Sequence, residues 1–151
     1  MDLTKFTERA RGFVQAAQTI AIRENHQRIL PEHLLKAIMD DEQGFATNLI
    51  TQSGGDARVV RQAVDAAVAK LPQVSGEGTQ VFVDTSTAKL LGEAEEIAKK
   101  AGDQFVPVER VLMALALGKS AAKDALSKGN VSAQALNAAI NDIRKGRRAD
   151  S

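Results

Sequence analysis

The sequence has 151 residues, a net charge of +1, 44% hydrophobic residues and no cysteine. This composition allows one folded domain with its own core, and the lack of cysteine excludes disulfides and thiolate chemistry. A net charge so close to zero gives no overall electrostatic attraction to nucleic acid or to a membrane surface. No apolar run approaches the ~20 residues of a membrane span, and the first residues lack the apolar stretch of a signal peptide. We therefore expect a soluble, cytoplasmic domain without nucleic-acid or membrane partners.

Apolar residues at helical spacing predict four helices in the first half of the chain. Proline suits the first position of a helix because its missing N–H has no partner there, so Pro31 marks a helix start. The first expected helix is capped by Thr4 or Thr7 and runs to about Arg23, and the second runs from Pro31 to about Asp40. The third is short, carries Phe45 and Leu49 and ends at residues 53–55, and the fourth is capped by Asp56 and stopped by Pro72.

The second half of the chain repeats the first at a constant offset of 77 residues. A gapless internal match of this kind indicates a duplicated structural unit. Identical pairs include Ala17 and Ala94, Ile20 and Ile97, Gln27 and Gln104, Glu32 and Glu109, and Leu35 and Leu112. The helices of the second half are expected after Ser86, from Pro107 to about Gly118, around residues 122–126, and after Ser132.

The predicted fold is all-α, with eight helices in two four-helix repeats that are related by a pseudo-twofold axis within a single domain, residues 1–151. Repeat one spans residues 1–72, a linker 73–85, repeat two 86–146 and a tail 147–151. Val81–Val83 in the linker is expected either to pack back on the domain or to form a brief extended piece. No stretch alternates with a period of two for long enough to predict a sheet. Residues 13–38 and 90–115 should therefore superpose as helix–turn–helix units without a strand.

The chain lacks the motifs of common catalytic and phosphate-binding sites, because it has no glycine-rich phosphate loop and no nucleophile beside a base. His26 and His33 are seven residues apart without cysteine or carboxylate partners at ligand spacing, so surface or helix-capping histidines are favoured over a metal site. The basic run Arg144–Arg148 is expected to be a solvated tail. Glu32 and Glu109 favour a structural role at helix starts, and only one of them need serve binding.

Four motifs of the duplicated pattern carry a family resemblance. They are Phe6-Thr7-Glu8-Arg9-Ala10, Ile29-Leu30-Pro31-Glu32-His33-Leu34-Leu35, Leu71-Pro72-Gln73-Val74-Ser75-Gly76, and Gly102-Asp103-Gln104-Phe105-Val106. With them the whole chain resembles the N-terminal repeat domain of Clp-family AAA+ chaperones, and within that family the disaggregases. The resemblance implies a monomeric domain without a cofactor of its own. In a parent protein it would be joined to two ATPase modules that use ATP and Mg²⁺, form a homohexamer and cooperate with the DnaK chaperone system.

The function implied by the resemblance is the capture of unfolded or aggregated polypeptides through their exposed apolar segments. The resemblance places the polar rim of a binding groove at Thr7, Asp103 and Glu109, with Leu91 a weaker candidate for an apolar wall. Thr7 belongs to the first repeat and the two carboxylates to the second, so these three residues can meet only at the seam between the repeats. The carboxylates would attract the lysine and arginine side chains that flank apolar segments.

Two other functions remain open from the sequence. In the first, the domain belongs to an unfoldase that feeds a protease, and its surface binds a folded adaptor protein. In the second, the chain is a small helical enzyme, against which the lack of paired catalytic groups argues. A nucleotide-binding Walker A motif beyond Ser151 would decide in favour of the chaperone and unfoldase class.

Overall fold

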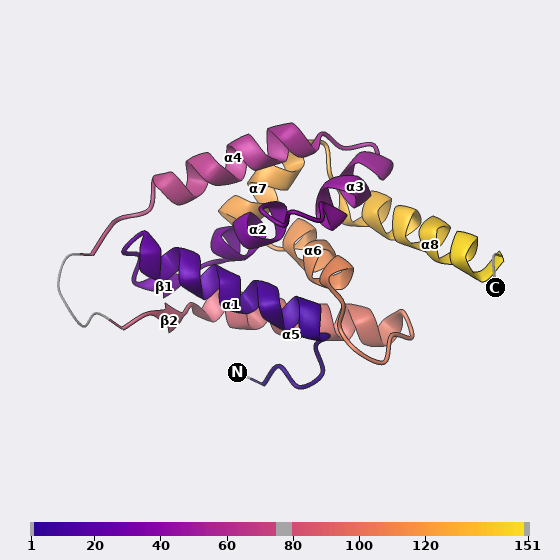
Figure 1. Cartoon of the computed structure of the whole chain (residues 1–151), viewed down its shortest axis with the longest axis horizontal. Coiled ribbons are helices and arrows are strands. Elements are labelled where there is room, and N and C mark those ends of the chain that lie inside the picture. Colours follow the sequence, from indigo (N-terminus) through magenta and orange to yellow (C-terminus); the bar gives the residue numbers. More distant parts are fainter. Residues whose placement is uncertain (1, 75–79, 150–151) are drawn as a thin grey trace.

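Eight helices form most of the chain that the computed structural model describes, residues 2–74 and 80–149 (Figure 1). The helices are α1 (Glu8–Arg23), α2 (Pro31–Met39), α3 (Phe45–Gln52), α4 (Ala57–Ala69), α5 (Thr85–Lys100), α6 (Val108–Leu117), α7 (Ala121–Lys128) and α8 (Ala133–Ala149). Two short strands, β1 (Arg28–Ile29) and β2 (Phe82–Val83), lie between them. The predicted all-α fold is confirmed, and each expected helix is present in the described residues.

Side-chain caps begin the first helix of each repeat. The Thr7 hydroxyl accepts a hydrogen bond from the backbone N–H of Ala10 at 3.1 Å, so Thr7 rather than Thr4 is the cap of α1. The cap of α5 differs from the prediction, because the Asp84 carboxylate accepts from the N–H of Ser86 at 3.0 Å. A carboxylate at this position satisfies N–H groups that a helix start leaves without partners. Helix α5 therefore begins at Thr85, inside the predicted linker.

Two short stretches of parallel backbone pairing join the two halves of the chain. β1 in the first repeat pairs in parallel with β2, so that Ile29 lies opposite Val83. The pseudo-twofold counterpart joins Phe6 to Val106, since each of these residues is offset by 77 from a member of the first pair. The expectation that residues 13–38 contain no strand is therefore wrong, because strands of two residues are too short to produce a sequence period. The pairing follows the offset of the duplication and so supports it.

The two repeats share one core. Helix α1 packs on α2, and their counterparts α5 and α6 pack on each other in the same way. The last helix of each repeat also packs on the central helix of its own repeat, and contacts across the pseudo-twofold axis join α4 to α7 and α3 to α8. Helices α2 and α6 lie in the middle of the molecule and are buried over most of their lengths (Figure 1). This exchange of helix pairs explains why the chain folds as one domain rather than two.

The close approach of α4 and α7 depends on a glycine. A Cβ atom at Gly129 would lie 2.8 Å from the carbonyl oxygen of Asp56 and would overlap the side chain of Val60. In turn, the Asp56 N–H donates to the carbonyl oxygen of Gly129 at 2.8 Å, which fixes the end of α7 against the start of α4. Only glycine leaves room for this contact between the repeats.

Two predicted boundaries change at the ends of the described segments. Helix α8 continues to Ala149, so residues 147–149, predicted as a tail, are helical. The predicted linker includes residues 75–79, which lie outside the described residues, and its segment 81–83 contains β2 as the expected extended piece. Among the described residues, no helix has the length and apolar character needed to cross a bilayer.

Candidate functional site

The structure brings three of the four predicted site residues to the seam between the repeats. Thr7 donates its backbone N–H to the carbonyl oxygen of Val106 at 3.0 Å. Asp103 and Glu109 lie three residues before and after Val106, in the turn ahead of α6 and in its first turn. Leu91 differs, because its side chain is 2% exposed and lies in the core rather than on a groove wall. It therefore offers no surface to a ligand in this structure.

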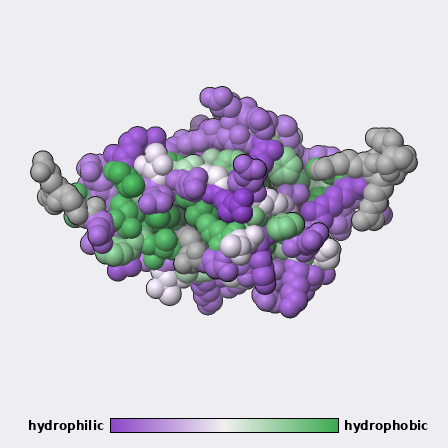
Figure 2. All heavy atoms as spheres, turned by 60° about the horizontal axis from the view of Figure 1, so that its bottom comes forward, coloured by the Kyte–Doolittle hydropathy of each residue, from purple (hydrophilic) through white to green (hydrophobic). Residues whose placement is uncertain are grey.

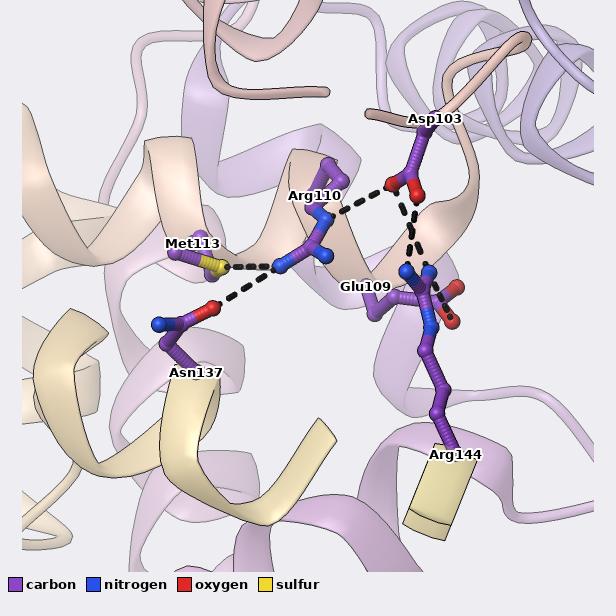
Figure 3. Close-up of polar contacts among 6 residues, drawn as sticks. All are labelled: Asp103, Glu109, Arg110, Met113, Asn137 and Arg144. Carbon is purple, nitrogen blue, oxygen red and sulfur yellow. Dashed lines mark hydrogen bonds and ion pairs between the residues drawn. The ribbon is translucent and has the colours of Figure 1, made fainter. Parts of the chain in front are cut away.

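Two arginines hold the Asp103 carboxylate (Figure 3). Arg110 Nε donates to Oδ2 at 2.8 Å, while Arg144 donates from Nη1 to Oδ1 at 2.7 Å and from Nη2 to Oδ2 at 3.3 Å. Arg144 Nη2 also lies 3.5 Å from Glu109 Oε2. The expectation that the basic run is solvated is therefore wrong for Arg144, whose side chain turns back from α8 to bind two carboxylates.

The guanidinium group of Arg110 lies inside the core, and the residue is 1% exposed. A buried charge of this kind is tolerated only when its donors find acceptors. Its Nη1 donates to Asn137 Oδ1 at 3.0 Å and contacts Met113 Sδ at 3.3 Å, while Nε is bound to Asp103. Arg110 therefore supports the Asp103 carboxylate from within the protein (Figure 3).

The charges of Asp103, Glu109, Arg110 and Arg144 cancel one another. Burial opposes the ionisation of Asp103, but hydrogen bonds from Arg144 and Arg110 outweigh it and lower the pKa of this carboxyl group. The pKa of Arg144 is raised, mainly by its hydrogen bond to Asp103. With two carboxylates beside two guanidinium groups, this cluster does not form the net negative rim expected from the sequence. Glu109 makes the longest of these contacts and is the carboxylate most readily released to a ligand.

An exposed aromatic side chain lies beside this cluster. Phe105 is 50% exposed and follows Asp103 by two residues. A half-exposed aromatic ring offers a large apolar contact area to a binding partner. Phe105 is not among the site residues predicted from the sequence, although one signal was available. The first repeat has Arg28 at the equivalent position, so the duplicated core does not require a phenylalanine there. We call Thr7, Asp103, Phe105 and Glu109 the seam surface.

The first repeat contains a neutral counterpart of the Asp103–Arg110 pair. His26 and His33 occupy the equivalent positions, with His26 Nδ1 2.8 Å from His33 Nε2. Because the Leu30 N–H donates to His33 Nδ1 at 2.9 Å, a neutral His33 carries its proton on Nε2 and donates it to His26. Burial, and then His26, lower the pKa of His33 to about 4. His33 thus caps the start of α2, but both histidines are buried rather than on the surface.

Two hollows, one beside Glu109 and one between α1 and α2, differ in their capacity for a ligand. The crevice beside Glu109, which has no room for a ligand, is lined by Phe45, Leu49, Ile140, Ile143 and Arg144. A hollow of about 620 Å³ lies between α1 and α2, with Phe13, Ala16 and Ile20 among its apolar lining residues. Binding at the seam surface therefore relies on exposed side chains rather than on the crevice.

The duplicated, interlocked helices place the chain in the class of all-helical repeat domains. Residues 5–129 match the family described as Clp repeat (R) N-terminal domain, and the chain belongs to this family. The resemblance found in the sequence motifs is thereby confirmed. A Clp N-terminal domain by itself is non-catalytic, which does not favour the reading of the chain as a small enzyme.

Relatives of known name extend this assignment. Chaperone protein ClpB of Agrobacterium fabrum is 56% identical over 152 residues, which cover 100% of this chain and 17% of that protein. Chaperone protein ClpB of Rhizobium meliloti is 52% identical over 152 residues, with 100% of this chain and 18% of that protein covered. The chain thus spans less than a fifth of the length of these relatives. The Hsp104 N-terminal domain from Candida albicans shares the fold, with a TM-score of 0.80 at 19% identity over 93% of this chain and 91% of that one.

Proposed function

We propose that the domain captures exposed apolar segments of unfolded or aggregated polypeptides for an ATP-dependent disaggregase. The observation that carries this proposal is the match of the whole chain to proteins named Chaperone protein ClpB, in one case at 56% identity. In such a parent, the remaining length would hydrolyse ATP with Mg²⁺ in a cytoplasmic homohexamer that cooperates with the DnaK system. The domain itself would be a monomeric binding module, and we expect no ATP turnover from it because it has no phosphate-binding loop.

The seam surface combines the contacts that such capture needs. Phe105 supplies exposed apolar area, the burial of which is worth about 25 cal/mol per Å². The contact of 3.5 Å between Glu109 and Arg144 is long enough for a lysine or arginine of the substrate to replace Arg144 as the partner of the carboxylate. Asp103, held by two arginines, keeps the turn that carries Phe105 in place.

We expect binding at the seam surface to be weak and rapidly reversible. Phe105 is the one large apolar side chain of this surface, so the apolar area available for burial is small. Fixing a flexible substrate chain also costs conformational entropy, which subtracts from the gain of that burial. Weak binding suits a domain that must release each captured segment to the rest of its parent protein.

The proposed function is tested by titrating the domain with a reduced and carboxymethylated, permanently unfolded protein and measuring fluorescence anisotropy. Phe105→Ser and Glu109→Gln should each raise the dissociation constant by about fivefold, because each removes one contact worth about 1 kcal/mol. The control is Leu117→Ser, which removes a side chain of similar exposure at the end of α6 and should leave the dissociation constant unchanged. Equal binding by all variants would overturn the seam assignment, and no binding by the wild-type domain would overturn the function.

The alternative function, docking of a folded adaptor protein, is favoured by the hollow between α1 and α2. Its volume of about 620 Å³ is typical of specific binding sites, into which a folded partner inserts a preformed side chain. Ala16→Arg would fill this hollow. The substitution should leave the binding of unfolded protein unchanged if the chaperone function is correct, and loss of that binding would move the site from the seam surface to the hollow.

A further inference from the structure

Strand β2 pairs with β1 through only one of its edges. The Phe82 N–H donates to the carbonyl oxygen of Gln27 at 3.0 Å, and the Asp84 N–H donates to that of Ile29 at 3.1 Å. Successive residues of a strand direct their backbone groups to opposite edges. The N–H and C=O groups of Val83 therefore point away from β1, and among the described residues neither group has a hydrogen-bond partner.

The equivalent edge in the first repeat is closed by a turn. Phe6, which lies 77 residues before Val83, donates its N–H to the carbonyl oxygen of Leu3 at 3.0 Å and is 2% exposed. Val83 makes no such bond to Gln80, the counterpart of Leu3, and it is 37% exposed. The duplication has therefore produced one closed strand edge and one open edge.

The open edge is apolar as well as unpaired. Val81, Phe82 and Val83 follow one another there, and Phe82 is 49% exposed. Figure 2 shows a hydrophobic area on the side of the molecule where β1 and β2 lie. Soluble proteins usually protect exposed strand edges by keeping them short or with charged residues or proline, because such edges pair with other chains. Strand β2 is short, but neither a charged residue nor a proline lies between Val81 and Val83.

We propose that the outer edge of β2, residues Val81–Val83, binds an extended apolar segment of a non-native polypeptide as an added strand. This inference rests on the proposed function and specifies the form in which the substrate binds. Unpaired strand groups are satisfied by an extended chain and not by a helix, and unfolded polypeptides present extended apolar segments. A second copy of this chain is a poorer occupant, because so short an edge buries far less than the roughly 1,000 Å² of a specific dimer.

Binding through the backbone suits a domain that meets many different sequences. The hydrogen bonds of an added strand involve main-chain groups, so they are the same for every substrate. The exposed side chains of Phe82 and Val83 would favour apolar residues beside those bonds without demanding one sequence. The edge and the seam surface lie at the two pseudo-twofold-related backbone pairs, so one substrate chain of sufficient length can contact both.

The test uses two probes, a capped pentapeptide, Thr-Val-Phe-Val-Thr, and the reduced and carboxymethylated unfolded protein. Amide hydrogen exchange of Val83 should slow when either probe binds, because its N–H gains an acceptor. Val83→Pro removes this N–H without touching the N–H groups of Phe82 and Asp84 that bond to β1. It should weaken peptide binding by about tenfold, whereas Val83→Thr, which keeps the N–H and the branched shape, should weaken it by less than about threefold.

The outcomes separate this inference from the proposed function. If the unfolded protein binds but Val83 exchange is unchanged and Val83→Pro binds both probes like the wild type, the edge is not the site, although the domain still captures substrate. If neither probe binds the wild-type domain, both proposals fail. If Val83 becomes protected as the domain concentration rises without any probe, the edge pairs with a second copy and the inference is overturned. Should Val83→Pro fail to fold, hydrogen exchange in the unmodified chain decides the question.

Discussion

Arg110 binds Asp103 through an ion pair of 2.8 Å at the position where the first repeat has a hydrogen bond of 2.8 Å between two histidines. In each repeat, the pair ties the turn after the long first helix to the first turn of the next helix. Both repeats have a buried polar link at this position, between two histidines in the first repeat and between an aspartate and an arginine in the second. Because a buried polar group without its partner is costly, a change in one member of the pair requires a change in the other.

The buried ion pair predicts that replacing Arg110 lowers the stability of the domain more than replacing Arg144 does. Arg110→Met should lower the free energy of unfolding by about 3 kcal/mol, because it removes a fully buried charge and leaves Asp103 and Asn137 short of a donor. Arg144→Met is the control and should cost about 1 kcal/mol or less, since its side chain is 30% exposed. Urea denaturation of the two variants measures the difference. Equal losses, or a larger loss for Arg144→Met, would show that the buried pair is not the stronger link.

The histidine pair predicts a stability that falls in mild acid. The pKa of His33 is lowered from 6.5 to about 4, so between these pH values the unfolded chain binds a proton at this residue and the folded chain does not. The free energy of unfolding should therefore rise with pH across this window, with a contribution from His33 of up to roughly 3 kcal/mol. An NMR titration of the His33 ring checks the cause directly. A midpoint near 6.5 in the folded domain would contradict it.

Two glycines predict opposite effects of the same substitution. Gly129→Ala should destabilise the domain by about 2 kcal/mol, because the added Cβ atom would overlap Val60 and crowd the carbonyl oxygen of Asp56. Gly12→Ala should stabilise it by up to ~1 kcal/mol, since Gly12 lies within α1 and a Cβ there meets nothing within 4 Å. Thermal unfolding followed by circular dichroism compares the two. A destabilising Gly12→Ala would reveal a packing role that the structure does not contain.

The helices could be predicted because their signals are local and occur twice. Pro31 and the Thr7 cap mark starts, and the offset of 77 residues lets each half support the other. The backbone pairs between the repeats could not be predicted in this way, because two residues carry no period. The packing of α4 on α7 could not be predicted either, because it depends on which helix faces meet across the pseudo-twofold axis.

The candidate site was predicted only in part. The turn that carries Asp103 and the start of α6 that carries Glu109 followed from the repeat, but their partner Arg144 lies 41 residues beyond Asp103 in what read as a basic tail. The burial of Arg110 could not be predicted, because the sequence does not show that Asn137 provides an acceptor for its guanidinium group inside the core. Side-chain geometry was needed to find that the carboxylates are already paired.

Chemical-shift mapping of the isotope-labelled domain with the permanently unfolded protein tests the central claim most directly. We predict that the backbone shifts cluster on the seam surface and that Glu109→Ala reduces them without loss of helicity. Its equivalent in the first repeat, Glu32, is 7% exposed and serves as the internal comparison. Capture at the seam would be contradicted if the shifts spare the seam surface and cluster around Glu32 and His33. It would also be contradicted if the Glu109→Ala variant unfolds, because the Glu109 carboxylate would then be structural.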